Sequence, residues 1–385
     1  MKSIQITALS VALSLALVGC AAETEENGVE SEIIGQDPNE TEVDGSENGE
    51  ANEADDTGTN ESQGFIDIIE SRDVAGGLNI PWSIVHHEDI FYLTEREGVI
   101  AKVENGEVTR EELDVTEEVL HYGEGGLLGF VLDPNFADNA KAYLYYTYGT
   151  EAEALNRVIE VEHREGTWVE TAILIDEIKG AQFHHGGRLA IGPDDKLYIT
   201  TGDALEESLS QDLNDVAGKI LRLEFDGSIP EDNPDPSSPI YSYGHRNPQG
   251  LAWDEEGQLF SSEHGPSAHD EINRIEPGLN YGWPEIMGDE TADGMEVALY
   301  HSGNDTWAPS GMVYLDGHLY VAALRGSMVI GFDTNGGQSE VIWEGEGRIR
   351  DIFVEGNSLY IITNNTDGRG MPGPEDDRLI ELIFE

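Results

Sequence analysis

The sequence is short of cysteine, of basic residues and of long apolar runs. Cys20 is the only cysteine among 385 residues, so an intrachain disulfide is excluded and stability must come from a hydrophobic core. The 78 acidic residues against 20 lysines and arginines give a formal net charge of −58. Because such a surface repels phosphate groups, nucleic acid and anionic membranes are not expected as partners. The apolar run at residues 4–18 is shorter than the roughly 20 residues that a membrane-spanning helix needs.

The N-terminus has the pattern of an export signal. Lys2 precedes the apolar run, and Leu17-Val18-Gly19-Cys20 has the form of a lipobox. We expect residues 1–19 to be a signal peptide and Cys20 to carry a lipid after cleavage. This predicts an extracytoplasmic protein that is lipid-anchored to the cell membrane. A fortuitous cysteine in an ordinary signal peptide is the alternative.

Residues 20–63 have the composition of a disordered linker. From residue 21 onward they contain no lysine or arginine, many acidic residues and hardly any large apolar side chains. Such a segment cannot bury enough apolar surface to offset the entropy of ordering. An acidic tail that binds a cation or a partner is the alternative interpretation. The folded domain is expected over residues 64–385.

The folded part repeats an apolar strand, a tight turn and a second strand, at a period of roughly 50 residues. Turn pairs such as Asp316-Gly317 and Gly356-Asn357 suit β-hairpins, and a further strand follows in most repeats. The repeats lie at residues 84–93, 129–146, 189–199, 251–260, 312–321 and 352–362. They predict an all-β fold, a six-bladed β-propeller of four-stranded antiparallel blades, whose ring closure leaves few exposed strand edges. A pair of β-sandwiches and a β-helix are the alternatives.

Three polar stretches interrupt this pattern, at residues 184–188, 243–250 and 262–284. The second of them combines a cation, two amides, a proline and glycines. Burying a polar group without a partner costs roughly 2–7 kcal/mol, so these residues are not expected to fill a core. They are typical of loops that a rigid scaffold holds against a ligand.

Four motifs in these stretches occur in a fixed order: HxxGR at 184–188, GHRNPQG at 244–250, EHGPxxxDEIN at 263–273 and NYGWP at 280–284. With them, the chain from residue 77 onward resembles the soluble sugar dehydrogenases that use pyrroloquinoline quinone (PQQ). These include the aldose sugar dehydrogenases and the soluble quinoprotein glucose dehydrogenases. The resemblance implies a six-bladed propeller that uses PQQ and Ca2+ to oxidise an aldose at its anomeric carbon. The product would be a lactone, and an external acceptor would take the electrons.

The resemblance assigns three catalytic residues. His184 matches the general base that takes the proton of the sugar's anomeric hydroxyl while hydride passes to the quinone. A neutral imidazole suits this task near neutral pH. Asp203 matches the carboxylate that orients the base. Arg246 would pair with a quinone oxygen and stabilise the negative charge that develops there.

The resemblance also implies further contacts with the cofactor. Asn247 and Gln249 would supply amide donors next to Arg246. Arg325, Arg348 and Arg350 would hold the cofactor's carboxylates. Arg348 and Arg350 alternate along an expected strand, so both side chains should face one side. An exposed pair of charges is the alternative for these two arginines.

Calcium would be held largely by backbone oxygens. Gly265 and Pro266 offer no side-chain chemistry, but calcium accepts carbonyl oxygens together with carboxylates and water. In the family that the chain resembles, these two carbonyls hold the calcium that contacts the quinone. Asp270, Glu271 and the backbone oxygen of Tyr281 match a second, structural calcium site. Simple surface acidity is the alternative for the two carboxylates.

Two departures from the glucose-oxidising members favour a broad sugar preference. Glu124 would line the cofactor or sugar pocket, at a position where those members are expected to carry glutamine. The stretches at residues 203–218 and 304–307 are shorter than theirs, which resembles the compact aldose dehydrogenases with a more open pocket.

Two other functions remain to be weighed. A calcium-dependent propeller lactonase would need a cage of carboxylates and amides at the central channel. A non-enzymatic ligand-binding propeller would have lost its cofactor. The arginines, which suit a trianionic cofactor, argue against the lactonase, and the presence of His184, Arg246 and Gln249 argues against the non-enzymatic propeller.

Overall fold

The computed structural model describes residues 64–385, so the predicted signal peptide, the lipid anchor at Cys20 and the acidic linker lie outside the described residues. Strands dominate the described part. Its helical elements are the short helix α1 (Phe136–Asn139) and the 3-10 helix η1 (Glu207–Gln211). Neither is long and apolar enough to cross a membrane.

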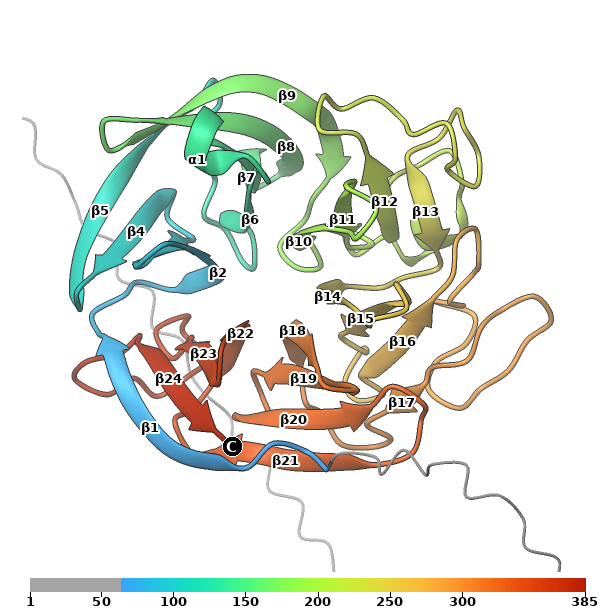
Figure 1. Cartoon of the computed structure of the whole chain (residues 1–385). Helices are drawn as coiled ribbons and strands as arrows, with labels where there is room; N and C mark the ends of the chain where they lie inside the picture. Colours follow the sequence, from blue (N-terminus) through green and yellow to red (C-terminus); the bar gives the residue numbers. More distant parts are fainter. Residues whose placement is uncertain (1–63) are drawn as a thin grey trace, which may run out of the picture. The chain divides into compact units, whose positions relative to one another are not determined.

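The strands form four four-stranded sheets and one eight-stranded sheet, which follow one another around a ring (Figure 1). Three of the four-stranded sheets are antiparallel meanders of consecutive strands. These strands are β10 (Gly186–Ile191), β11 (Leu197–Thr201), β12 (Lys219–Leu223) and β13 (Ile240–Tyr243); β14 (Pro248–Trp253), β15 (Leu259–Glu263), β16 (Glu271–Ile275) and β17 (Tyr300–His301); and β18 (Pro309–Leu315), β19 (His318–Ala323), β20 (Met328–Asp333) and β21 (Ser339–Glu344).

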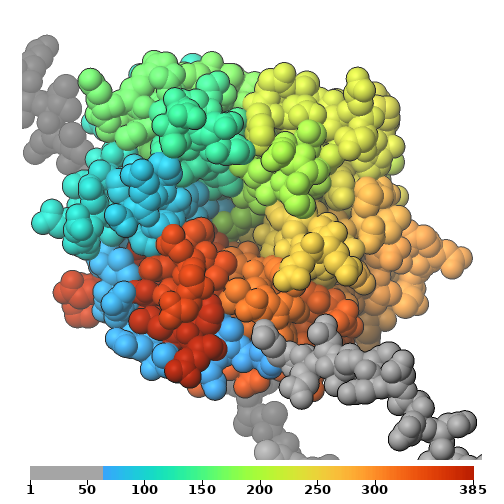
Figure 2. Space-filling model, in the orientation of Figure 1, coloured from blue at the N-terminus to red at the C-terminus, as the bar shows by residue number. Residues whose placement is uncertain are grey.

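The fourth four-stranded sheet joins the first described strand to the last one, in the order β1-β24-β23-β22. Ile68 pairs with Phe384 and Ala75 with Leu379. The first and last parts of the domain therefore lie side by side, as the neighbouring blue and red surfaces show (Figure 2). This pairing closes the ring. The strands are β1 (Ile68–Ala75), β22 (Ile349–Glu355), β23 (Ser358–Thr363) and β24 (Leu379–Phe384).

The eight-stranded sheet consists of two antiparallel meanders joined at their outer edges. The parallel pairing of β5 with β9, from Glu112 with Thr167 to Asp114 with Val169, connects them. The strands are β2 (Pro81–His87), β3 (Ile90–Glu95), β4 (Val99–Glu104), β5 (Glu107–Asp114), β6 (Leu127–Leu132), β7 (Lys141–Thr150), β8 (Glu153–Arg164) and β9 (Thr167–Lys179). The all-β prediction is confirmed and the sheets are consistent with a β-propeller. Six separate sheets were expected, but the structure has five, because hydrogen bonds between β5 and β9 join two of them into one.

The first strand of each meander lies nearest the centre of the ring. Around the centre, β2, β6, β10, β14, β18 and β22 each contact the next strand, and β22 contacts β2. The loops that precede these inner strands therefore converge.

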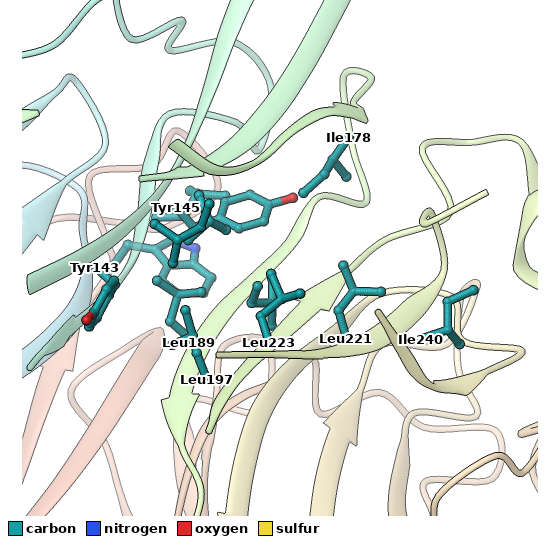
Figure 3. Close-up of a cluster of buried hydrophobic side chains, with 13 residues drawn as sticks. Tyr143, Tyr145, Ile178, Leu189, Leu197, Leu221, Leu223 and Ile240 are labelled. Atoms are coloured by element: carbon teal, nitrogen blue, oxygen red, sulfur yellow. The ribbon is translucent and has the colours of Figure 1, made fainter. Parts of the chain in front are cut away.

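The sheets are held together by apolar side chains packed between their faces. One cluster lies where β7 packs against β10 to β13 (Figure 3). Tyr145, Leu197 and Leu221 are fully buried in it. Burying a leucine of this kind contributes roughly 1.5–3 kcal/mol, so such clusters can hold the loops without a disulfide.

Candidate active site

A cavity of about 580 Å3 lies where the loops that precede the inner strands converge. Most of the predicted site residues line it, although they come from sheets all around the ring. They are Glu124, His184, Arg246, Asn247, Gln249, Gly265, Pro266, Asp270, Arg325, Arg348 and Arg350. Asp203, Glu271 and Tyr281 do not line this cavity.

Asp203 lies directly behind His184. Its Oδ1 accepts hydrogen bonds from His184 Nδ1 at 2.7 Å and from Leu205 N at 2.8 Å, and its Oδ2 accepts one from Trp283 Nε1 at 2.9 Å. The buried carboxylate thus holds the proton on Nδ1 and leaves Nε2 free to accept another. His184 has a left-handed φ of 63°. Gly202 is required beside it, because a Cβ at that position would overlap the His184 carbonyl.

Arg246 bridges the histidine and the neighbouring loop. Its Nη2 donates to His184 Nε2 at 2.9 Å, and its Nη1 donates to the carbonyls of His264 at 3.0 Å and Gly265 at 2.7 Å. The guanidinium also lies over the ring of Trp283, and burial lowers the pKa of Arg246. A substrate hydroxyl that approaches His184 Nε2 must replace the contact with Arg246.

Glu263 shapes the loop that carries Arg246, and the sequence did not reveal this role. Its Oε1 accepts the backbone N–H groups of Arg246 and Asn247, and its Oε2 lies 2.9 Å from His245 Nδ1. Asn247 Oδ1 in turn accepts the N–H of Gly186 at 2.9 Å and so joins two site loops. Glu263 is the first residue of the EHGPxxxDEIN motif, and this position is the signal in the sequence that could have indicated its role.

Three arginines form a cationic wall. Arg350 is buried and donates to Gln249 Oε1 at 2.7 Å, whereas Arg348 pairs with Asp367 at 3.0 Å. Arg325 is exposed and makes no ion pair with any other described residue. Arg348 and Arg350 face the same cavity, as their alternation in sequence predicted.

Three buried nitrogen atoms of residues that line the cavity lack a hydrogen-bond partner within residues 64–385. They are Arg246 Nε, His264 Nε2 and Arg350 Nε. Burial lowers the pKa of His264 to about 4. Burial and then the nearby Arg348 lower the pKa of Arg350 to about 9. The guanidinium groups of Arg246 and Arg350 form no ion pair with the described residues, and a buried cation is costly unless an anion pairs with it, so this cavity suits an anion.

The residues predicted for the second calcium site line two different cavities, Asp270 the large one and Glu271 and Tyr281 a small one. Asp270 Oδ1 accepts from Gly265 N at 2.9 Å. Its Oδ2 accepts from Thr306 Oγ1 at 2.9 Å, Trp307 N at 2.6 Å and Ala308 N at 2.8 Å. By accepting these hydrogen bonds, the Asp270 carboxylate fixes the loops that contain Gly265 and residues 306–308. Asp270 and Glu271 line different cavities, because consecutive residues of an extended chain point to opposite faces, and the assignment of Asp270 as a calcium ligand stays a prediction.

Glu271 and Tyr281 line a small adjoining cavity, together with Glu263. Its volume of about 10 Å3 has room for one water-sized ligand. Burial, and then the neighbouring Glu263, raise the pKa of Glu271 to about 7. In the described part of the chain, no cluster of three or more histidine, cysteine or acidic side chains forms a metal site.

Glu124 lies at the rim of the large cavity and is paired with a residue that sequence reasoning missed. Its Oε1 accepts from Arg369 Nη1 at 2.8 Å, and its Oε2 accepts the backbone N–H of His184 at 3.2 Å. Arg369 belongs to no motif, and its contact spans 245 residues of sequence.

The fold and the site together define an all-β ring protein whose central cavity joins a histidine–carboxylate pair to a cluster of arginines. The chain belongs to the glucose/sorbosone dehydrogenase family, whose model matches residues 78–372. The relationship that the motifs indicated is thereby confirmed.

Named relatives and a solved structure agree with this membership. Quinoprotein glucose dehydrogenase B of Acinetobacter calcoaceticus is 36% identical over 60% of this chain and 56% of that protein. Aldose sugar dehydrogenase YliI of Escherichia coli is 29% identical over 76% of this chain and 89% of that protein. The PQQ-bound aldose sugar dehydrogenase of Streptomyces coelicolor is 37% identical, with a TM-score of 0.77, and the match covers 84% of this chain and 99% of that one. Each of these relatives is named as an oxidoreductase.

Proposed function

We propose that this chain is a PQQ- and calcium-dependent dehydrogenase that oxidises aldoses at the anomeric carbon to lactones. The observation that carries the proposal is the His184–Asp203 pair, whose histidine lines one cavity with Arg246 and Arg350, two arginines that form no ion pair with the described residues. We take the scaffold to be a six-bladed propeller, because the ring has six inner strands and the eight-stranded sheet divides at the β5–β9 seam.

The residues present fit PQQ, which carries three carboxylates and an ortho-quinone. Arg325, Arg348 and Arg350 would face the carboxylates, and the buried Arg350 Nε would gain the partner that it lacks. Arg246 and Gln249 would contact the quinone end. Bound PQQ would supply the two-electron acceptor for the hydrogen on the sugar's anomeric carbon.

The chain's own part in the reaction is the movement and stabilisation of a proton. His184 Nε2 would accept the proton of the anomeric hydroxyl, and Asp203 would stabilise the imidazolium from Nδ1. Arg246 would leave Nε2 and turn its guanidinium toward negative charge in the cavity. A general base contributes roughly 10²–10⁴-fold to such a rate.

Calcium would be bound at two places. The carbonyl oxygens of Gly265 and Pro266, on the cavity wall, would hold one ion beside the cofactor. The small adjoining cavity lined by Glu271 and Tyr281 would hold a second ion. Asp270 would support these sites through the loops that it fixes.

The charge of the cavity favours this function over a lactonase. Its lining contains five arginines against two acidic residues, Glu124 and Asp270, whereas a lactonase cage needs carboxylates around the metal. The substrate would be an aldose and the acceptor an external redox partner. The lipobox at Cys20 supports an extracytoplasmic, membrane-anchored location.

A spectroscopic experiment tests the proposal. The purified protein is loaded with PQQ and Ca2+, and aldoses are then added while the absorbance of the bound cofactor is recorded. Reduction that depends on both the aldose and His184 is the expected result. Hydrolysis of a lactone with no change in the cofactor spectrum would instead favour the lactonase.

A further inference from the structure

The loop between β23 and β24, residues 364–378, reaches across to the rim of the large cavity. From it, Arg369 contacts two loops that belong to other sheets. Its Nη1 donates to Glu124 Oε1 at 2.8 Å, and its guanidinium lies 5.3 Å from the centre of the Phe183 ring. Glu124 precedes β6, and Phe183 directly precedes His184. One side chain therefore connects three parts of the ring.

The partner of Arg369 touches the backbone of the proposed base. Glu124 Oε2 accepts the N–H of His184 at 3.2 Å, and Glu124 N donates to Gln182 O at 2.8 Å. His184 has a left-handed φ, which costs a residue with a side chain roughly 1–3 kcal/mol unless its surroundings hold it. The contact with Glu124 is one of the contacts that hold it.

Glu124 is ionised in this setting. Burial alone would raise its pKa, but His264, Arg369 and the His184 N–H hold the pKa of Glu124 at about 2. The contact between Glu124 and Arg369 is therefore an ion pair at neutral pH. Its two side chains are 18% and 45% exposed, so it lies at the mouth of the cavity and not in its floor.

We infer that Arg369 is a positioning residue for the oxidation: through Glu124 and Phe183 it holds the His184 backbone so that the imidazole faces the substrate. The inference rests on the proposed function. A role as another clamp for the cofactor's carboxylates is the rival. It is disfavoured because the carboxylate that pairs with Arg369 also accepts the His184 N–H, whereas Asp367, the partner of Arg348, makes no hydrogen bond to His184.

The test is a double-mutant cycle of Arg369→Ala and Glu124→Gln in the full chain. If Arg369 acts through Glu124, each single change should lower kcat/KM for an aldose by about tenfold, and the double variant should be no worse than either. Affinity for PQQ should stay within about twofold of wild type, since a positioning residue does not bind the cofactor. Arg369→Lys should recover part of the loss.

A second readout does not depend on turnover. The imidazole NMR signals of His184, assigned with His184→Ala, are compared in the cofactor-free protein. Arg369→Ala and Glu124→Gln should both shift these signals. Arg164→Ala is the matched control, because Arg164 forms a similarly exposed pair with Glu162 at 2.9 Å away from the cavity, and it should not shift them.

Three results would overturn the inference. The losses from Arg369→Ala and Glu124→Gln could multiply in the double variant. PQQ affinity could fall tenfold in Arg369→Ala, which would make it a clamp. The His184 signals could be unmoved in both variants. A protein that oxidises no aldose but shows the NMR shifts would refute the proposed function and leave the link between Arg369 and His184 standing.

Discussion

Replacing Arg350 with methionine should change stability and cofactor affinity in opposite directions. Arg350 is buried, its Nε has no partner in the described part of the chain, and Arg348 lies nearby. A cation whose pKa is lowered by folding destabilises the folded state at every pH below that lowered value. The charge therefore opposes folding at neutral pH until an anion binds. Methionine keeps much of the side-chain volume and removes the charge.

The magnitude follows from the burial and the contacts. Burial, and then the nearby Arg348, lower the pKa of Arg350 from its ordinary value to about 9. At about 1.4 kcal/mol per pKa unit, this corresponds to a cost of about 5 kcal/mol. The change also removes the hydrogen bonds to Gln249 Oε1 at 2.7 Å, Ser310 Oγ at 3.3 Å and Asn364 Oδ1 at 3.3 Å. These three bonds contribute about 0.5–1.5 kcal/mol each, so the cofactor-free variant should be about 0.5–3.5 kcal/mol more stable than wild type.

Urea unfolding of the cofactor-free protein and a PQQ titration measure the two effects. Loss of a charge-assisted contact of about 1.5–3 kcal/mol should weaken PQQ binding about 10- to 100-fold. Arg348→Met is the matched control. It should weaken PQQ binding as well, but it should lower stability, because it leaves the buried carboxylate of Asp367 unpaired. A less stable Arg350→Met protein that binds PQQ as tightly as wild type would refute the reasoning.

Three further predictions concern the base, the metal and acid stability. His184→Ala should retain PQQ binding and lose aldose oxidation by roughly 10²–10⁴-fold, and near-full turnover together with a loss in His185→Ala would show the base to be wrongly assigned. Prolonged chelation should abolish activity and Ca2+ with PQQ should restore it, because the Gly265 and Pro266 carbonyls need the ion; full turnover without bound calcium would contradict this. Burial lowers the pKa of His185 to about 4, so the unfolded chain binds more protons between about pH 6.5 and 4. Acidification through that window should therefore cost about 3 kcal/mol of unfolding free energy, and His185→Asn should show a shallower dependence in unfolding titrations from pH 7 to 4.

The sequence carried enough information for the all-β class and for the repeated hairpins. The alternation of apolar residues and the turn pairs such as Asp316-Gly317 are local signals, and each fell where two strands meet. The pairing of β5 with β9 was not predictable in this way. It joins the edges of two meanders that are far apart in sequence, and edge pairing depends on strand length and twist.

The site was predictable where a motif carried it. His184, Arg246 and Gln249 meet in one cavity because the first two lie on loops that precede inner strands and Gln249 lies at the start of the inner strand β14. The hydrogen bonds by which Asp270 fixes two loops were not predictable, because its donors lie up to 38 residues away in sequence. Arg369 was missed because no local pattern distinguishes an arginine in a glycine-rich loop, and its partner lies 245 residues away in sequence.

The central claim is that this cavity binds PQQ and passes an aldose's hydrogen to it with His184 as the base. The most direct measurement is the absorbance of the PQQ- and Ca2+-loaded protein before and after addition of an aldose, in wild type and in His184→Ala. The account predicts PQQ binding by both proteins, rapid reduction in wild type, and reduction in the variant that is slower by at least about a hundredfold. Failure of the wild-type protein to bind PQQ, or equal rates of reduction in the two proteins, would contradict it.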